Sequence, residues 1–142
     1  HTLTLRTSLI GREIETNHGL IEWFLSHEGG VVNGYTRAIF SGLTTNALSV
    51  IIATIIKDYP QMCGVWHVAS EPISKYDLLN LVKTVYNLDI VIQPDDSVVI
   101  DRSLNGSRLL KNTNIIIPPW QMMIEQMHQD LTPYAALRSK KC

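Results

Sequence analysis

Short blocks of apolar residues alternate with polar turns along the whole chain, and their spacing is of two kinds. In residues 2–10, leucines and an isoleucine lie among Thr, Arg and Ser, a pattern that predicts a strand closed by Gly11. Asn33-Gly34 is typical of a turn that leads into a β-like run. Further blocks predict strands over residues 35–41, 64–70 and 89–94.

Other blocks repeat apolar residues at intervals of three or four, as the buried face of a helix requires. Thr44 or Thr45 can cap a helix that Pro60 ends, and its run "ALSVIIATII" predicts that both faces are largely covered. Ser74 and Asp77 have the spacing of a capping box. Helices are expected over residues 18–27 and 46–59, within 71–88, and over 120–131 after Pro118-Pro119, with a loop and one or two helical turns over 95–113.

Strands and helices therefore alternate along the chain, which is the order of an α/β protein. The blocks 2–10 and 64–70 are apolar enough to lie inside a parallel sheet between helices. Two parallel strands leave their faces and outer edges exposed, so they do not make a domain by themselves. The pattern of the first strand begins at the second residue, with no polar segment before it. We therefore expect the rest of the sheet to come from a segment before His1.

Composition and charge exclude several classes of protein. With 142 residues, of which 45% are hydrophobic, the chain can build one packed domain. The formal net charge is −1 and the cations are dispersed, apart from the tail 138–142, so no nucleic-acid partner is expected. The apolar run is half of the ~20 residues that a membrane helix needs, so no membrane partner is expected either. Two cysteines, Cys63 and Cys142, favour a reducing, cytoplasmic location over a disulfide framework.

The histidines show no metal-ligand spacing with Cys, Asp or Glu, so we expect no metal. Asp95-Asp96 is typical of a turn and not of an acid–base pair. The five histidines lie apart from one another, at His1, His18, His27, His67 and His128.

Four segments occur in an order that resembles a known family: "TLRTSLIG", "GYTRAIFSGLTTNALSVII", "GVWHVASEPISKYDLLNLV" and "DRSLNGSRL". They resemble the C-terminal half of the extended short-chain dehydrogenases/reductases. Within that group the chain looks most like the nucleotide-sugar reductases of the dTDP-4-dehydrorhamnose reductase type, with sugar epimerases and dehydratases close behind. The likeness runs from about Leu3 to Met127. It implies an α/β fold that is the C-terminal part of a Rossmann-like, NAD(P)-binding fold, with late sheet strands and the small substrate-binding subdomain.

The resemblance also implies how the chain is divided. The last Rossmann strands would lie at about 2–11 and 64–70, and the interleaved substrate-binding segments at about 12–43 and 89–131. The N-terminal cofactor half would precede His1, so residues 1–142 are expected to be a single fragment of a longer enzyme.

Two motifs of the family are absent from this sequence. Its glycines never form Gly-x-Gly-x-x-Gly, the turn that lets backbone N–H groups approach a dinucleotide pyrophosphate. No tyrosine is followed four positions on by lysine, the pair that the family uses for proton transfer. Tyr134 and Arg138 mimic that spacing in a polar tail, where we do not expect chemistry. The resemblance therefore implies no catalytic residue in this chain, no binding of NAD or NADP by it alone, and no turnover by it alone.

By the resemblance, this portion holds a nucleotide-diphosphate sugar. Arginine suits a diphosphate because its planar guanidinium donates two hydrogen bonds to phosphate oxygens. The residues expected to bind substrate are Arg37, Arg102, Asn17 and His18. Thr7 and Ser8 end the first strand, where the family places the nicotinamide, so they are expected to contact the cofactor. Alternatives are an exposed turn arginine at Arg37, a salt bridge from Arg102 to Asp96 or Asp101, and an exposed helix-start histidine at His18.

The leading hypothesis is the substrate-binding portion of an NAD(P)-dependent nucleotide-sugar reductase, in which the complete enzyme passes hydride to a sugar carbonyl. An epimerase or dehydratase of the same family is the nearest alternative. A non-catalytic regulatory or scaffold domain of the same descent is a second, and an unrelated small α/β binding module a third. The expected partners are the nucleotide sugar, the cofactor half and, as the family allows, a second copy in a homodimer.

Overall fold

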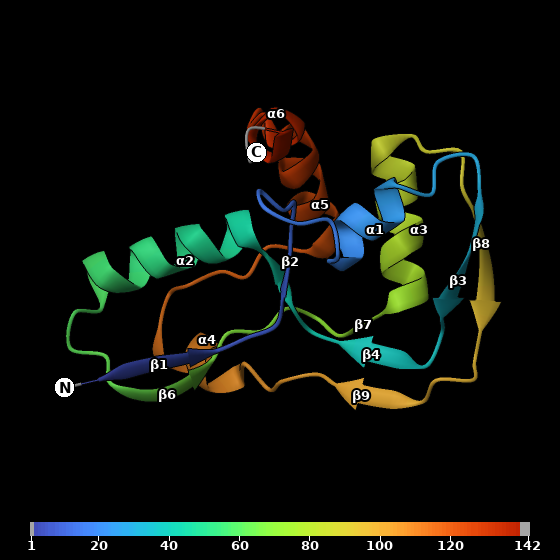
Figure 1. Cartoon of the computed structure of the whole chain (residues 1–142). Helices are drawn as coiled ribbons and strands as arrows, with labels where there is room; N and C mark the ends of the chain where they lie inside the picture. The colour runs from blue at the N-terminus through green and yellow to red at the C-terminus, as the bar shows by residue number, and fades with distance from the viewer. Residues whose placement is uncertain (1, 140–142) are drawn as a thin grey trace.

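Small sheets and helices alternate in the computed structural model, which describes residues 2–139 (Figure 1). This order confirms the α/β class. The strands are β1 (Leu3–Arg6), β2 (Leu9–Ile10), β3 (Val31–Tyr35), β4 (Ala38–Phe40), β5 (Leu43–Thr44), β6 (Gly64–His67), β7 (Ile73–Ser74), β8 (Val91–Asp95) and β9 (Ile100–Arg102). The helices are α1 (Leu20–Leu25), α2 (Thr45–Asp58), α3 (Lys75–Tyr86), α4 (Ser107–Asn112), α5 (Trp120–Gln129) and α6 (Tyr134–Ser139).

Most of the strand pairing is parallel. β1 pairs with β6, β2 with β5 and β3 with β8, all in parallel. In the remaining sheet β4 lies between β7 and β9, antiparallel to β7 and parallel to β9. Leu3 lies opposite Gly64 and Arg6 opposite His67, so the two apolar blocks of the sequence do meet in one parallel pair.

The first predicted strand is divided in two. β1 ends at Arg6 and pairs with β6, whereas β2 starts at Leu9 and pairs with β5. Thr7 and Ser8 lie between the two strands, where the chain changes its pairing partner. The backbone around Ser8 is therefore free of regular pairing, although its carbonyl accepts the N–H of Leu43 at 2.9 Å.

Both predicted helix caps are confirmed. The Thr44 hydroxyl accepts a hydrogen bond from the N–H of Ala47 at 3.3 Å, at the start of α2. The Ser74 hydroxyl accepts one from the N–H of Asp77 at 3.0 Å, at the start of α3. Each cap satisfies a donor that the first helical turn leaves without a partner inside the helix. Asn87 ends α3 in the left-handed conformation, with φ 54°.

The coverage of α2 differs from the prediction. Ile51 and Ile55 are buried, as an apolar helix in an α/β fold requires. Val50 and Ile56, however, are 66% and 71% exposed, so the expectation that both faces are largely covered is wrong. The reason is that the described chain packs against one side of α2, and its other side faces solvent.

The main core lies where α3 packs against α5 and against the β3–β8 pair. α1 adds Ile21 and Phe24, which have no exposed surface. On α3 the apolar residues predict a buried stripe of Leu78, Leu79, Val82 and Val85. The first three are 1% exposed or less, whereas Val85 is only partly buried. Other fully buried side chains come from α5 and from the ends of strands: Met123, Ile124, Met127, Leu43, Val68 and Ile90.

The turn predicted at Asn33-Gly34 is wrong, because both residues lie within β3. A Cβ atom at Gly34 would lie 2.8 Å from side-chain atoms of Ile92 and Tyr76. This glycine therefore lets α3 approach the strand closely, and the chain turns instead at residues 36–37.

Besides β3, four elements have no counterpart in the sequence prediction: β5, β7, β9 and α6. β9 lies inside the predicted loop over residues 95–113, and all three of its residues are exposed, so no alternation of apolar side chains marks it. α6 lies in the tail that the sequence analysis took to be polar.

Within residues 2–139, no helix has the length and apolar character that crossing a membrane requires. Cys63 is an exposed free thiol. His1 and Cys142 lie outside the described residues.

Candidate functional site

A cation from β9 and another from α3 are brought together by the sheet around β4. Phe40, the last residue of β4, pairs with Arg102 on one side and with Ile73 on the other. Lys75 begins α3, two residues after Ile73. The register therefore places Arg102 and Lys75 on either side of Phe40.

Ser8 reaches the same place from the end of β1. The carbonyl of Ser8 accepts the N–H of Leu43, and β2 then runs parallel to β5. A Cβ atom at Gly42 would lie 2.8 Å from that carbonyl oxygen, so this close approach requires glycine at position 42. The segment Ser41-Gly42-Leu43 thus joins the end of β4 to the end of β1.

A cavity of about 250 Å³ opens at this junction. Its lining combines aliphatic, aromatic and cationic side chains and contains no carboxylate: Ser8, Leu9, Ile10, Leu20, Phe40, Lys75 and Arg102. In the described part of the chain, neither Arg102 nor Lys75 takes part in an ion pair or a side-chain hydrogen bond. Two cations without a counter-ion beside an apolar wall suit an anionic ligand that also has a carbon framework.

Hydrogen bonds hold the loop that follows Arg102. The hydroxyl of Ser41, which is 1% exposed, accepts the N–H of Leu104 at 2.7 Å. Ser70 donates its hydroxyl to the carbonyl of Gly42 at 2.6 Å, and its N–H to the carbonyl of Ser41 at 3.1 Å. These contacts tie the segment after β6 and the loop after β9 to the same strand end, which fixes the base of Arg102.

A second cavity, of about 460 Å³, lies along the other side of that loop. Residues 69–72, which follow β6, and residues 103–107, which follow β9, line it together with Leu110. Both cavities are therefore built at the carboxyl ends of parallel strands, where open α/β sheets bind their ligands.

Of the residues predicted to form the site, Ser8 and Arg102 line the same cavity. Thr7 is adjacent, and its hydroxyl donates to the carbonyl of Ser8 at 3.2 Å. Arg102 makes neither of the salt bridges considered for it, because the carboxylate of Asp101 accepts the N–H of Ser103 instead.

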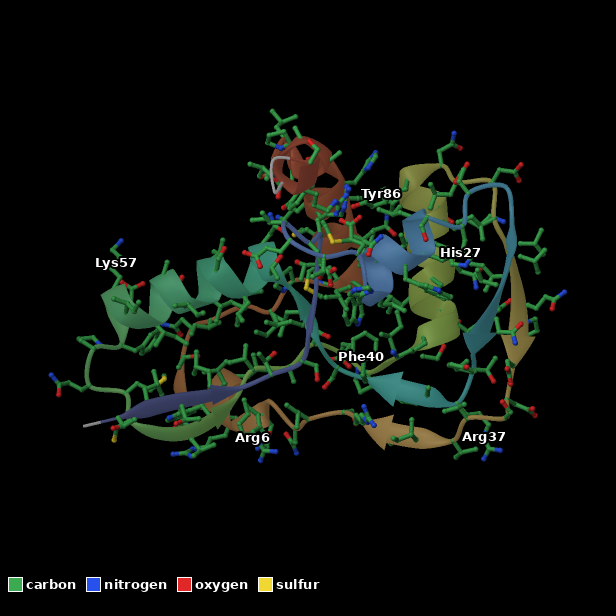
Figure 2. All side chains as sticks on the ribbon, viewed as in Figure 1. Arg6, His27, Arg37, Phe40, Lys57 and Tyr86 are labelled. Atoms are coloured by element: carbon green, nitrogen blue, oxygen red, sulfur yellow. The ribbon has the colours of Figure 1, made fainter. Side chains whose placement is uncertain are left out.

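Arg37, Asn17 and His18 lie elsewhere. Arg37 is exposed in the turn between β3 and β4, and Figure 2 shows it well apart from Phe40, near the start of β9. Phe40 lies three positions after Arg37, which corresponds to about 10 Å of extended chain. Asn17 and His18 are exposed in the loop before α1, where the N–H of His18 donates to the carboxylate of Glu13 at 3.0 Å.

Sequence reasoning missed Lys75. The signal that could have identified Lys75 is its position at the start of the helix, directly after the capping Ser74. A cation in the first turn of a helix lies near the positive end of the helix dipole, so Lys75 gains nothing from the dipole of α3.

Tyr134 and Arg138, which mimic the catalytic spacing, are engaged in structural contacts. The hydroxyl of Tyr134 donates to the carboxylate of Asp130 at 2.6 Å, and Arg138 pairs with Glu22 at 3.0 Å. Burial and the bond to Asp130 raise the pKa of Tyr134. Both side chains are thus occupied by contacts within the fold.

The described residues offer no group of three or more His, Cys, Asp or Glu side chains that could hold a metal ion. They also do not fit a dinucleotide pyrophosphate. α2 and α3 follow β5 and β7 directly, through Thr44 and Ser74, with no glycine-rich turn at either junction.

Comparisons with known proteins rest on the fold. No family model matches the sequence, and no curated protein is matched by its sequence. A crystal structure of dTDP-4-dehydrorhamnose reductase from Bacillus anthracis in complex with NADP matches 88% of this chain and 46% of its own length, with a TM-score of 0.75 and 16% identity. UDP-N-acetylglucosamine 4-epimerase from Bacillus cereus matches 89% of this chain and 46% of its own length, with a TM-score of 0.69 and 13% identity.

A dTDP-glucose 4,6-dehydratase from Bacillus anthracis, solved in complex with NAD, matches 95% of this chain and 47% of its own length, with a TM-score of 0.68 and 12% identity. The chain thus spans about half the length of the structures that it matches. At such identities the likeness shows the fold. The chain shares the α/β, Rossmann-like fold of these reductase, epimerase and dehydratase structures over about half of their length.

Proposed function

We propose that this chain is the substrate-binding C-terminal portion of an NAD(P)-dependent nucleotide-sugar reductase of the extended short-chain dehydrogenase/reductase type. The observation that carries the proposal is the cavity in which Arg102 and Lys75 stand without counter-ions beside Ser8, at the carboxyl ends of the strands. In the complete enzyme, NAD or NADP supplies a hydride to a sugar carbonyl. The described residues contribute the binding of the nucleotide sugar.

The lining of the cavity supports a diphosphate ligand. The guanidinium of Arg102 can donate two hydrogen bonds to phosphate oxygens, and the ammonium of Lys75 adds a second positive charge from the opposite side of Phe40. Leu9, Ile10 and Phe40 offer an apolar surface to the carbon framework of the ligand. The lack of a carboxylate in the lining removes the competing internal partner of both cations.

Three features support a partner that carries the cofactor site. β1 pairs with β6 alone in the described chain, so its other edge has free N–H and C=O groups. Val65 of β6 is 49% exposed, although parallel strands are normally covered on both faces. Val50 and Ile56 of α2 are exposed as well. We therefore propose that a cofactor-binding half adds strands at β1 and covers these side chains.

Calorimetric titration of this chain with dTDP and with thymidine tests the proposal. The two probes share a nucleoside and differ in the diphosphate, so dTDP is expected to bind at least about tenfold more tightly. Arg102→Ala and Lys75→Ala should each weaken dTDP by about 10- to 100-fold and leave thymidine unchanged, because each removes a charged hydrogen-bond donor.

Lys111→Ala, which removes an exposed cation at the end of α4, is the matched control and should bind dTDP like the wild type. Equal affinities of the wild type for dTDP and thymidine would contradict the proposal, and so would an unchanged affinity in Arg102→Ala. The same titration with Arg37→Ala, Asn17→Ala and His18→Ala tests the other proposed substrate residues, using a dTDP-sugar as the probe for the two loop positions.

A further inference from the structure

A buried carboxylate ties the C-terminal helix α6 to the loop before α1. Glu22 is 5% exposed. Its Oε1 accepts Nε–H of Arg12 at 2.6 Å and the N–H of Glu13 at 3.2 Å, and its Oε2 forms an ion pair with Nη1 of Arg138 at 3.0 Å. Arg138 also donates to the carbonyl of Glu13 at 2.8 Å. One guanidinium of α6 therefore holds both a carboxylate of α1 and the backbone of the loop.

The other end of α6 is fixed as well. The hydroxyl of Tyr134 donates to the carboxylate of Asp130, which also accepts a hydrogen bond from Asn46 of α2 at 3.1 Å. The guanidinium of Arg12 lies over the ring of Tyr134, 5.0 Å from its centre. Because residues four apart share a face of a helix, Tyr134 and Arg138 reach the same loop from one side of α6.

This loop, residues 11–19, forms part of the boundary of the candidate site. It starts after Ile10 and ends before Leu20, and both of these side chains line the cavity of Arg102 and Lys75. A neighbouring cavity of about 210 Å³ shares Ile10 and Leu20 and is lined by Arg12 and Glu13 of the loop itself. Loop 11–19 is thus the covalent connection between two residues that line the cavity.

We infer that Arg138 is a positioning residue, through which α6 clamps loop 11–19 and sets the shape of the cavity at the end of β1. The consequence for ligand affinity rests on the proposed function. The clamp itself does not, because it acts on the free protein.

Two backbone amides report on the clamp directly. The N–H of Glu13 is bound to Glu22, and the N–H of His18 is bound to the carboxylate of Glu13. Hydrogen exchange of this chain, measured residue by residue by NMR, is expected to be about 10- to 100-fold faster at both amides in Arg138→Ala. In the wild type, Nη1 of Arg138 contacts both the carboxylate of Glu22 and the carbonyl of Glu13. Arg138→Lys keeps a positively charged donor but not the planar guanidinium that places Nη1 there, so its rates should lie between those of Arg138→Ala and the wild type.

Arg108→Ala is the matched control. Arg108 also donates to a backbone carbonyl, that of Val65 at 2.9 Å, and lies over an aromatic ring, Trp66, at 3.9 Å, but it is in α4. It should leave the exchange of Glu13 and His18 unchanged.

Unchanged exchange at Glu13 and His18 in Arg138→Ala would overturn the inference. A uniform acceleration that includes amides in the middle of α3 would also overturn it, because Arg138 would then serve only global stability. With dTDP as the probe, Arg138→Ala should weaken binding severalfold, and Arg138→Lys should restore part of it. If the wild type does not bind dTDP, the proposed function fails while the exchange result still decides on the clamp.

Discussion

Replacing Glu22 by glutamine tests how much the buried carboxylate contributes to stability. Glutamine has nearly the same shape but no charge, and its NH₂ group faces guanidinium groups that can only donate. Removing one partner of a buried ion pair costs about 3–5 kcal/mol. The side chains of Arg12 and Arg138 are 23% and 24% exposed, so water solvates part of the freed charge. We therefore expect Glu22→Gln to lower the free energy of unfolding by about 2–3 kcal/mol at neutral pH.

The pH dependence gives the same prediction a second test. Burial alone raises the pKa of Glu22, but the hydrogen bonds from Arg12, Arg138 and the N–H of Glu13 outweigh it and hold the pKa below the usual 4.5. A carboxyl group whose pKa is lower in the folded state stabilises the protein above the unfolded pKa, and this contribution is lost as the pH falls through the folded pKa. Below about pH 4.5, the wild type should therefore lose more stability than Glu22→Gln.

Urea unfolding at pH values from about 7 to 3 measures both effects. The control is Glu125→Gln, which removes the charge of an exposed glutamate on α5 and should change the free energy of unfolding by less than about 0.5 kcal/mol. If Glu22→Gln were as stable as the wild type at pH 7, or followed the same pH profile, the network around Glu22 would not stabilise the fold and the reasoning would be refuted.

Three further substitutions test other parts of the structure. Gly42→Ala places a Cβ atom against the carbonyl of Ser8, so it should destabilise the chain by about 1–3 kcal/mol in thermal unfolding; an unchanged Tm would show that this approach is not tight. Ser41→Ala leaves the N–H of Leu104 without its partner, which should lower the free energy of unfolding by about 1–3 kcal/mol and weaken dTDP binding in the calorimetric titration. A dTDP affinity equal to that of the wild type would show that the Ser41–Leu104 hydrogen bond does not affect the site. Ile56→Glu, on the exposed side of α2, should change the free energy of unfolding by less than about 0.5 kcal/mol, and a larger loss would show that Ile56 is covered in solution.

Local signals in the sequence were enough for the elements that they specify directly. The hydroxyls of Thr44 and Ser74 cap α2 and α3 because each satisfies an amide within its own first turn, which a short stretch of sequence can show. Gly34 was misread because its reason is tertiary: it makes room for Tyr76 and Ile92, and Asn-Gly has the same letters whether the glycine serves a turn or close packing. β9 was missed because pairing with β4 stabilises it and its side chains do not alternate.

In the candidate site, too, some residues could be identified from the sequence and others only from the packing of distant elements. Ser8 and Arg102 were chosen by resemblance, and the structure places them around one cavity; their roles there stay a prediction. Lys75 was missed because its contribution arises only when α3 starts beside β4, 35 residues after Phe40 in the chain. The partners of Arg138 lie even farther away, in the loop before α1 and in α1 itself. Spacing within a motif cannot show such contacts, since they depend on how distant elements pack.

In the described chain, two cations have no counter-ion and several apolar side chains are exposed, and these two groups contribute differently to the free energy of the free chain. Arg102 and Lys75 remain hydrated while no anion is bound, so the cavity does not destabilise the free chain. Val50, Ile56 and Val65 expose apolar surface, and burying such surface yields about 25 cal/mol for each Å² removed from water. A small anion would pair with the two cations, and a protein surface would cover the apolar side chains. Because different residues are involved, we expect Arg102→Ala to abolish only the proposed ligand binding, and Ile56→Glu to abolish only the proposed association with a cofactor half.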